Sequence, residues 1–147
     1  MAAPTYKWEF IKDLWGNRTP KTATFEAKAS EDFAIGTLVN IDSGQVQAAG
    51  ASAASLLGIS LTEDTGVSSG DPIKVAIIAP GMVIRGTADA DASSLQGFNG
   101  KKADLNADGS LDVGDTAGGC LAVHRVNNSA GTEVDCVITE SDMGPVN

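Results

Sequence analysis

Hydrophobic and polar positions along the chain fall into short runs that predict β-strands. Six runs rich in Val, Ile, Leu and Thr are separated by clusters of Gly, Ser, Asp and Asn: GTLVNID, LLGISL, IKVAII, MVIRGTA, CLAVHRV and VDCVIT. Short β-branched runs bounded by turn residues are typical of strands. No long run shows the 3.6-residue period of an amphipathic helix. The sequence therefore predicts an all-β body, either a small β-barrel or a β-sandwich.

The predicted strands repeat in the same order in two halves of the chain, residues 35–79 and 99–140. Each half contains a Gly, a strand, a tight turn, a strand, a loop of small residues and two apolar strands. The aligned pairs include Gly36 with Gly100, Ile41 with Leu105, Gly44 with Gly109, Val46 with Leu111, Leu57 with Leu121 and Ile73 with Val134. We therefore expect an internal duplication of short strands within one domain, residues 29–147.

Residues 1–28 differ from this body and predict an extended N-terminal arm. The segment holds five of the seven aromatic residues of the chain, four of them within residues 6–15, and is interrupted by Gly16 and Pro20. Large aromatic side chains dominate the energetics of protein interfaces. The side chains that we expect to contact a sister subunit or another protein are Tyr6, Trp8, Phe10, Trp15, Lys7, Lys12 and Arg18. Packing of these aromatics on their own domain remains an alternative.

The charge of the chain narrows the range of its partners. The net charge is −9, which argues against binding to nucleic acid. No apolar run reaches the length of a membrane span, so we expect no membrane partner. The N-terminus lacks the basic and apolar regions of a secretory signal, so we expect no signal peptide. Cys120 and Cys136 lie in apolar runs, and we expect them to be buried and reduced.

The stretch DLNADGSLDVGD, Asp104 to Asp115, has the spacing of a calcium loop. Its ligand positions would be filled by Asp104, Asn106, Asp108, Asp112 and Asp115, with Gly109 at the sharp turn. However, its counterpart in the first half, NIDSGQVQAAG, lacks these carboxylates, and no helical pattern follows the loop. We therefore expect a β-hairpin without metal. A calcium-dependent extracellular β binding module remains the alternative.

The sequence gives little support to catalysis. His124 is the single histidine and lies inside the strand-like run CLAVHRV, where a structural role is expected. One histidine and two cysteines cannot complete a four-ligand zinc site. The Gly-rich stretches GFNGKK and DTGVSSGD match neither a P-loop nor a dinucleotide fingerprint. We expect no enzymatic activity and no cofactor, with a β-barrel enzyme using a pocket around His124 as the alternative.

Three stretches together resemble the small head-decoration (cement) proteins of tailed bacteriophages. They are DFAIGTLVNIDSGQVQAAGASAASLLGISLTED, GDPIKVAIIAPGMVIRGTADA and GKKADLNADGSLDV, and the resemblance covers roughly residues 31–139. It implies an all-β protein that binds the major capsid protein on the outside of the virion, often as a trimer, and has no catalytic residues. The chain would then be made in the host cytoplasm. The aromatic N-terminal segment is not part of the resemblance.

Overall fold

The chain folds almost entirely into β-strands. The computed structural model describes residues 3–50, 53, 55–98 and 100–138. The elements are β1 (Glu9–Asp13), β2 (Lys21–Glu26), β3 (Leu38–Asp42), β4 (Gln45–Ala48), β5 (Gly58–Ser60), β6 (Pro72–Ile77), β7 (Met82–Thr87), a 3₁₀ turn η1 (Ser93–Leu95), β8 (Asp104–Leu105), β9 (Leu111–Asp112), β10 (Leu121–Val126) and β11 (Glu133–Ile138). The predicted all-β class is confirmed. Within the described ranges, no helix is long and apolar enough to cross a membrane.

Strands β2 to β6 form the first of two similar units. They lie in the order β2-β6-β5-β3-β4, with antiparallel neighbours throughout. A parallel bridge between Ala27 and Val46 joins the end of β2 to β4, and the Lys28 N–H donates to the Val46 carbonyl at 2.9 Å. The sheet therefore closes on itself as a small barrel. The residues buried together inside it are Ala27, Phe33, Val39, Val46, Leu57, Val67, Ile73 and Val75.

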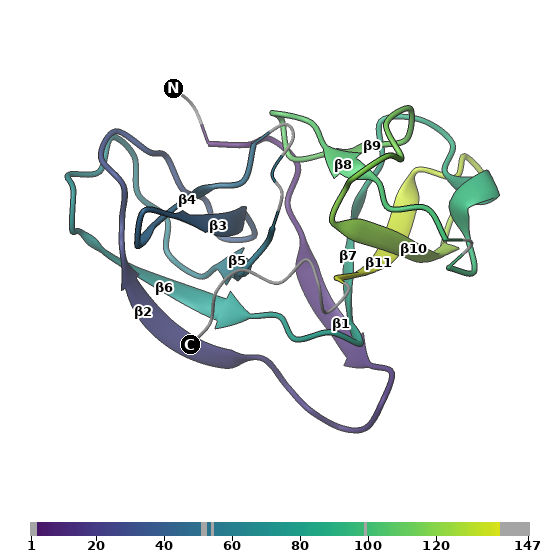
Figure 1. Ribbon diagram of the computed structural model, residues 1–147, viewed down its shortest axis with the longest axis horizontal. Helices are drawn as coiled ribbons and strands as arrows, with labels where there is room; N and C mark the ends of the chain where they lie inside the picture. Colours follow the sequence, from purple (N-terminus) through teal and green to yellow (C-terminus); the bar gives the residue numbers. More distant parts are fainter. Residues whose placement is uncertain (1–2, 51–52, 54, 99, 139–147) are drawn as a thin grey trace.

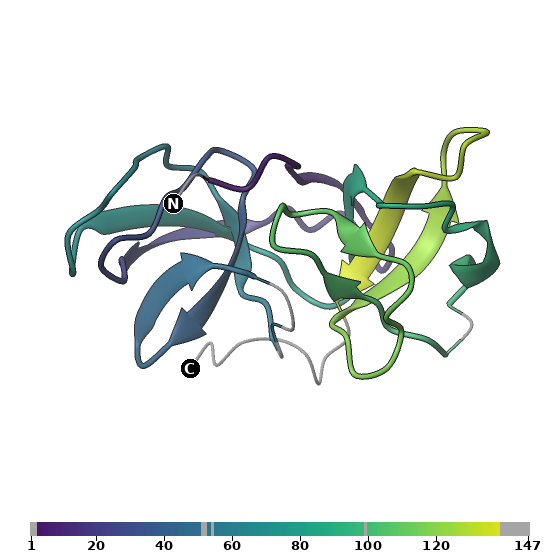
Figure 2. The ribbon, with the colours of Figure 1, turned by 90° about the horizontal axis from the view of Figure 1, so that it is seen from above.

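Strands β7 to β11 repeat this arrangement. The sheet runs β7-β11-β10, a bridge between Ala103 and Leu121 continues it to β8, and β8 pairs with β9. A parallel bridge between Ala88 and Leu111 then joins the end of β7 to β9. The strand order β7-β11-β10-β8-β9 matches the order β2-β6-β5-β3-β4 of the first unit when five is added to each strand number. Leu111 occupies the place of Val46 in the closing bridge, and the sequence alignment of the two halves also pairs these two residues. The predicted internal duplication is confirmed, and Figures 1 and 2 show the two units side by side.

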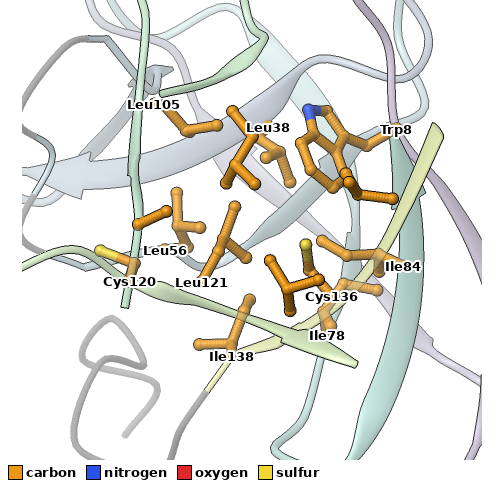
Figure 3. Close-up of a cluster of buried hydrophobic side chains, with 14 of the residues drawn as sticks. Trp8, Leu38, Leu56, Ile78, Ile84, Leu105, Cys120, Leu121, Cys136 and Ile138 are labelled. Carbon is orange, nitrogen blue, oxygen red and sulfur yellow. The ribbon is translucent and has the colours of Figure 1, made fainter. Parts of the chain in front are cut away.

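The two units share one apolar core. Its largest cluster contains Leu38, Leu56 and Ile78 from the first unit with Ile84 and Leu121 from the second, all at most 4% exposed (Figure 3). Because they share a core, we expect the two units to unfold cooperatively.

The prediction that the two cysteines are buried is confirmed. Cys120 and Cys136 both belong to the shared core (Figure 3). Burial raises the pKa of the Cys136 thiol strongly above its ordinary value. A thiol held in its neutral form is a poor nucleophile, so Cys136 is a packing residue.

The predicted N-terminal arm is not confirmed. β1 pairs antiparallel with β7 and adds a strand to the sheet of the second unit, while β2 is the first strand of the first unit. Trp8 is only 2% exposed and belongs to the shared core (Figure 3). The prediction that Trp8 contacts a partner is therefore corrected, because its indole is already buried by the chain's own second unit.

Candidate interaction surface

The stretch from Asp104 to Asp115 forms the predicted hairpin. β8 and β9 pair antiparallel around a turn in which the Asn106 N–H donates to the Ser110 carbonyl at 2.8 Å. Gly109 has a φ of +88°, a conformation that favours glycine. The equivalent turn between β3 and β4 uses Ser43 and Gly44, with φ values of +52° and +82°. Both copies therefore use the Gly of the repeat for a left-handed turn position.

The polar side chains of this hairpin are engaged with one another rather than directed at a common point. Asp108 Oδ1 accepts hydrogen bonds from the Ser110 backbone N–H at 3.0 Å and from its hydroxyl at 2.6 Å. The Asn106 amide donates to Asp89 Oδ2 at 2.9 Å. Among the residues that the structure describes, no three His, Cys, Asp or Glu side chains are placed to hold a metal ion. This geometry gives the calcium alternative no support.

Removal of calcium is expected to leave the stability unchanged. The melting temperature in EDTA should agree with that in calcium to within about 2 °C, because a ligand that does not bind the native state cannot stabilise it. Differential scanning calorimetry of the full chain measures both. A fall of more than about 10 °C in EDTA, reversed by added calcium, would contradict a metal-free hairpin.

Asp104 is the buried carboxyl group of this hairpin, at 8% exposure. Burial raises its pKa, and the neighbouring carboxylates of Asp115 and Asp112 raise it further. The folded state therefore holds the Asp104 proton more tightly than the unfolded state does. Stability falls as the pH rises from the ordinary aspartate pKa of about 3.9 through the raised value.

Replacing Asp104 by asparagine is expected to increase the free energy of unfolding at pH 7. Asparagine keeps the shape of the side chain and its ability to donate to Asp115, but it carries no charge. The gain should shrink as the pH falls and vanish near pH 3, where Asp104 itself is largely protonated. Urea unfolding at several pH values measures the difference in free energy of unfolding between Asp104→Asn and the unmodified chain. The control is Glu63→Gln, which removes the charge of an exposed carboxylate. A gain that does not depend on pH would contradict this account.

The turn of the hairpin holds the N-terminal segment in place. The Tyr6 N–H donates to the Asp108 carbonyl at 2.9 Å, and the Trp8 indole N–H donates to the Gly109 carbonyl at 2.8 Å. A Cβ atom on Gly109 would lie 2.4 Å from the Tyr6 carbonyl oxygen, so no side chain fits there. The turn residues of the calcium-like stretch thus have a packing role.

Trp15 is the largest exposed apolar side chain, at 73% exposure. It lies in a turn after β1 that Asp13 organises: the Asp13 carboxylate accepts from the backbone N–H groups of Trp15 and Arg18, both at 3.2 Å. Arg18 Nε donates to the same carboxylate at 2.7 Å, and Arg18 Nη2 donates to the Pro80 carbonyl at 2.9 Å. The hydrogen bond from Arg18 holds the pKa of Asp13 far below its ordinary value. The turn that carries Trp15 is therefore fixed to the body.

The other predicted contact residues do not form one surface with Trp15. Lys7, Lys12 and Arg18 are exposed, and Phe10 is half-buried against the core. Tyr6 is 39% exposed but lies before β1, at the β8–β9 turn, whereas Trp15 follows the far end of β1. The structure thus separates the predicted contact residues and leaves Trp15 as the most exposed aromatic side chain among them.

A groove that the sequence analysis did not predict lies beside Trp15. We call it the Trp15 groove; it has a volume of 640 Å³ and is lined by Leu14, Trp15, Pro80, Phe98, Ala122 and Val137, among others. Phe98 is 42% exposed, and its ring stacks on His124 with 5.2 Å between ring centroids. Burial lowers the pKa of His124. The sequence feature that could have indicated this groove is GFNGKK, in which a phenylalanine lies between two glycines and outside any strand pattern.

The chain matches no protein-family model and no curated protein sequence.

Proposed function

We propose that the protein is a non-enzymatic decoration protein that binds the outside of a tailed-phage capsid and stabilises it, as a homotrimer. The observation that carries this proposal is Trp15, whose indole is 73% exposed on a turn fixed to the body by Asp13 and Arg18. Tryptophan and arginine are the side chains most enriched among binding hot spots. A hot spot that is already held in place loses little conformational entropy on binding.

The closed form of both units supports the same role. Bridges from Ala27 to Val46 and from Ala88 to Leu111 join the first and last strands of each unit. Closure hides most strand edges, which protects a protein present at high local concentration from edge-to-edge aggregation. The net charge of −9 keeps free copies soluble before assembly. In a trimer, three weak contacts act together and hold each copy to the shell.

The experiment is co-sedimentation with capsids of the encoding phage assembled without this protein. Trp15→Ala is expected to weaken binding at least tenfold, equivalent to about 1.4 kcal/mol. The matched control is Ile35→Ala, which removes another exposed apolar side chain, 55% exposed, from the first unit. Circular dichroism should show both variants folded. Full occupancy by Trp15→Ala would remove Trp15 from the mechanism, and failure of the unmodified chain to bind any such capsid would overturn the proposal.

A further inference from the structure

We propose that the outer edge of β2 binds an extended segment of a partner protein, in which apolar and polar residues alternate. The segment pairs antiparallel with β2, as β1 pairs with β7 in the second unit. The inference adds a contact to the proposed function and rests on that proposal only for the identification of the partner as a capsid protein. Pairing of a peptide with β2 is measurable without a capsid.

β2 and β7 occupy equivalent places in the two units. Each closes its unit through a parallel bridge, at Ala27 in the first and at Ala88 in the second. The Ala27 N–H donates to the Asp71 carbonyl at 2.8 Å, and the Ala88 N–H makes the equivalent bond to Thr132. β2 pairs with β6 in the register in which β7 pairs with β11. Positions on β2 and β7 can therefore be compared one by one.

The second unit shows what covers this edge. β1 pairs with the outer side of β7, opposite Val83 and Arg85, of which the first is buried and the second half-buried. The equivalent positions on β2 are Thr22 and Thr24, whose side chains are exposed. β2 ends its sheet, and in the described part of the chain β6 is the strand that pairs along it (Figure 1). The first unit thus presents an edge that the second unit has filled.

The backbone groups of Thr22 and Thr24 point away from β6. Residues of an antiparallel strand alternate between bonding to one neighbour and facing the opposite side. Ala27 bonds on the β6 side, and Lys28 bonds on the other side, to Val46. The same alternation, counted back along β2, directs the N–H and C=O groups of Thr22 and Thr24 to the outer edge. An extended segment can add there as a further strand.

The side chains of β2 give the residue pattern of the segment. Phe25 packs against the core of the first unit, and Ala23, two residues earlier, lies half-buried on the same face. Directly opposite residues of paired strands share a face. The segment should therefore carry an apolar side chain opposite Ala23 and polar side chains opposite the exposed threonines. β1 has the same feature, because its half-buried Phe10 lies opposite Ile84, the equivalent of Ala23.

A second copy of β2 does not fit this edge. Two β2 strands paired antiparallel would place the residues before β2 of one copy beside Lys28 of the other. β4 already occupies that place, since Val46 bonds to Lys28. The residues before β2 are also held to their own body, because Arg18 is bonded to Asp13. The occupant is therefore a separate extended segment that ends before Lys28.

The test is an NMR titration of the full chain, labelled with ¹⁵N, with blocked peptides in which valine and threonine alternate. We expect saturable shifts of the Thr22 and Thr24 amides, which exchange rapidly with solvent in the free chain and become protected in the complex. N-methyl groups on the peptide threonines remove the N–H groups that face β2 and should weaken binding about fivefold or more. N-methyl groups on the valines, whose N–H groups face away from β2, should leave binding unchanged.

A proline variant makes the assignment specific. Thr24→Pro removes a donor from the outer edge and no hydrogen bond to β6, so it should weaken peptide binding about fivefold or more. The control is Phe98→Ala, which changes an exposed side chain of the second unit and should leave peptide binding unchanged. The methylated peptides test the same edge in the unmodified chain, so the result does not depend on the folding of Thr24→Pro.

Equal binding of the two methylated peptides overturns the inference. Exchange of the Thr22 and Thr24 amides in the free chain as slow as that of the Val83 and Arg85 amides also overturns it, because the edge would then already be paired. Peptide binding by a chain that binds no capsid overturns the proposed function alone. Capsid binding without any binding of the valine–threonine peptide overturns this inference alone.

Discussion

Replacing Trp8 by alanine is expected to lower the free energy of unfolding by about 3–5 kcal/mol, the usual cost of truncating a buried aromatic side chain. Trp8 is 2% exposed, and its indole N–H donates to the Gly109 carbonyl at 2.8 Å. The indole lies so close to Gly86 that a Cβ atom there would be 2.3 Å from it. The variant therefore leaves a cavity at the contact between the N-terminal segment and the second unit. Guanidinium unfolding followed by circular dichroism measures the loss.

The matched control is Trp15→Ala, which removes the same side chain from an exposed site and should change the free energy of unfolding by less than about 0.5 kcal/mol. A chain that begins at Lys21 lacks both β1 and Trp8, so we expect it not to fold. A loss of less than about 1 kcal/mol in Trp8→Ala, or a folded chain beginning at Lys21, would show that the N-terminal segment is dispensable for the body.

Replacing Arg85 by alanine is expected to lower the free energy of unfolding by about 3 kcal/mol at pH 7. Arg85 makes a two-point contact with Asp135, from Nε to Oδ1 at 2.8 Å and from Nη2 to Oδ2 at 3.2 Å. The Asp135 side chain is 2% exposed, so removal of Arg85 leaves a buried carboxylate without its strongest partner. Urea unfolding measures the change. Loss of less than about 1 kcal/mol would show that water reaches Asp135 in the variant.

The Arg85–Asp135 ion pair also predicts how the loss of stability in Arg85→Ala depends on pH. Burial is the largest single influence and acts to raise the pKa of Asp135, but hydrogen bonding, above all from Arg85, and the positive charges of Arg85 and Arg125 together outweigh it, and the pKa is lowered overall. A lowered carboxyl pKa stabilises the folded state above the ordinary value of about 3.9, and this contribution is lost as the pH falls through the folded value. The difference between Arg85→Ala and the unmodified chain should therefore narrow below about pH 4.

The matched control for Arg85→Ala is the double variant Arg85→Met with Asp135→Leu. It replaces the ion pair by apolar side chains and leaves no buried unpaired charge, since Glu133, the other partner of Arg85, is exposed. Its free energy of unfolding should lie within about 1 kcal/mol of that of the unmodified chain. A loss as large as that of Arg85→Ala would show that packing of the Arg85 stem, rather than the charge of Asp135, decides the effect.

The strands that the sequence predicted are those whose signal is local. The runs around Leu38–Asp42, Pro72–Ile77 and Glu133–Ile138 are apolar and bounded by turns, so their burial follows from their own composition. The hairpin at Asp104–Asp115 could be predicted because its counterpart in the first unit keeps the turn glycine without the carboxylates.

The parts that could not be predicted depend on distant contacts. Trp8 is buried by Gly86 and Gly109, and its hydrogen-bond partner is 101 residues away in the chain. β1 contains adjacent apolar residues, Phe10 and Ile11, because its pairing with β7 shifts register there, and this hides the alternation of a strand. The Trp15 groove likewise depends on segments from both ends of the chain, which no local pattern brings together.

The most direct test of the proposed function is a cryo-EM reconstruction of capsids of the encoding phage, assembled with and without the protein. We predict additional density on the outer surface only when the protein is present, with three copies around each occupied symmetry axis. The Trp15 turn and the Trp15 groove should face the capsid protein or a sister copy. Identical reconstructions with and without the protein, or bound copies whose Trp15 faces solvent, would contradict the account.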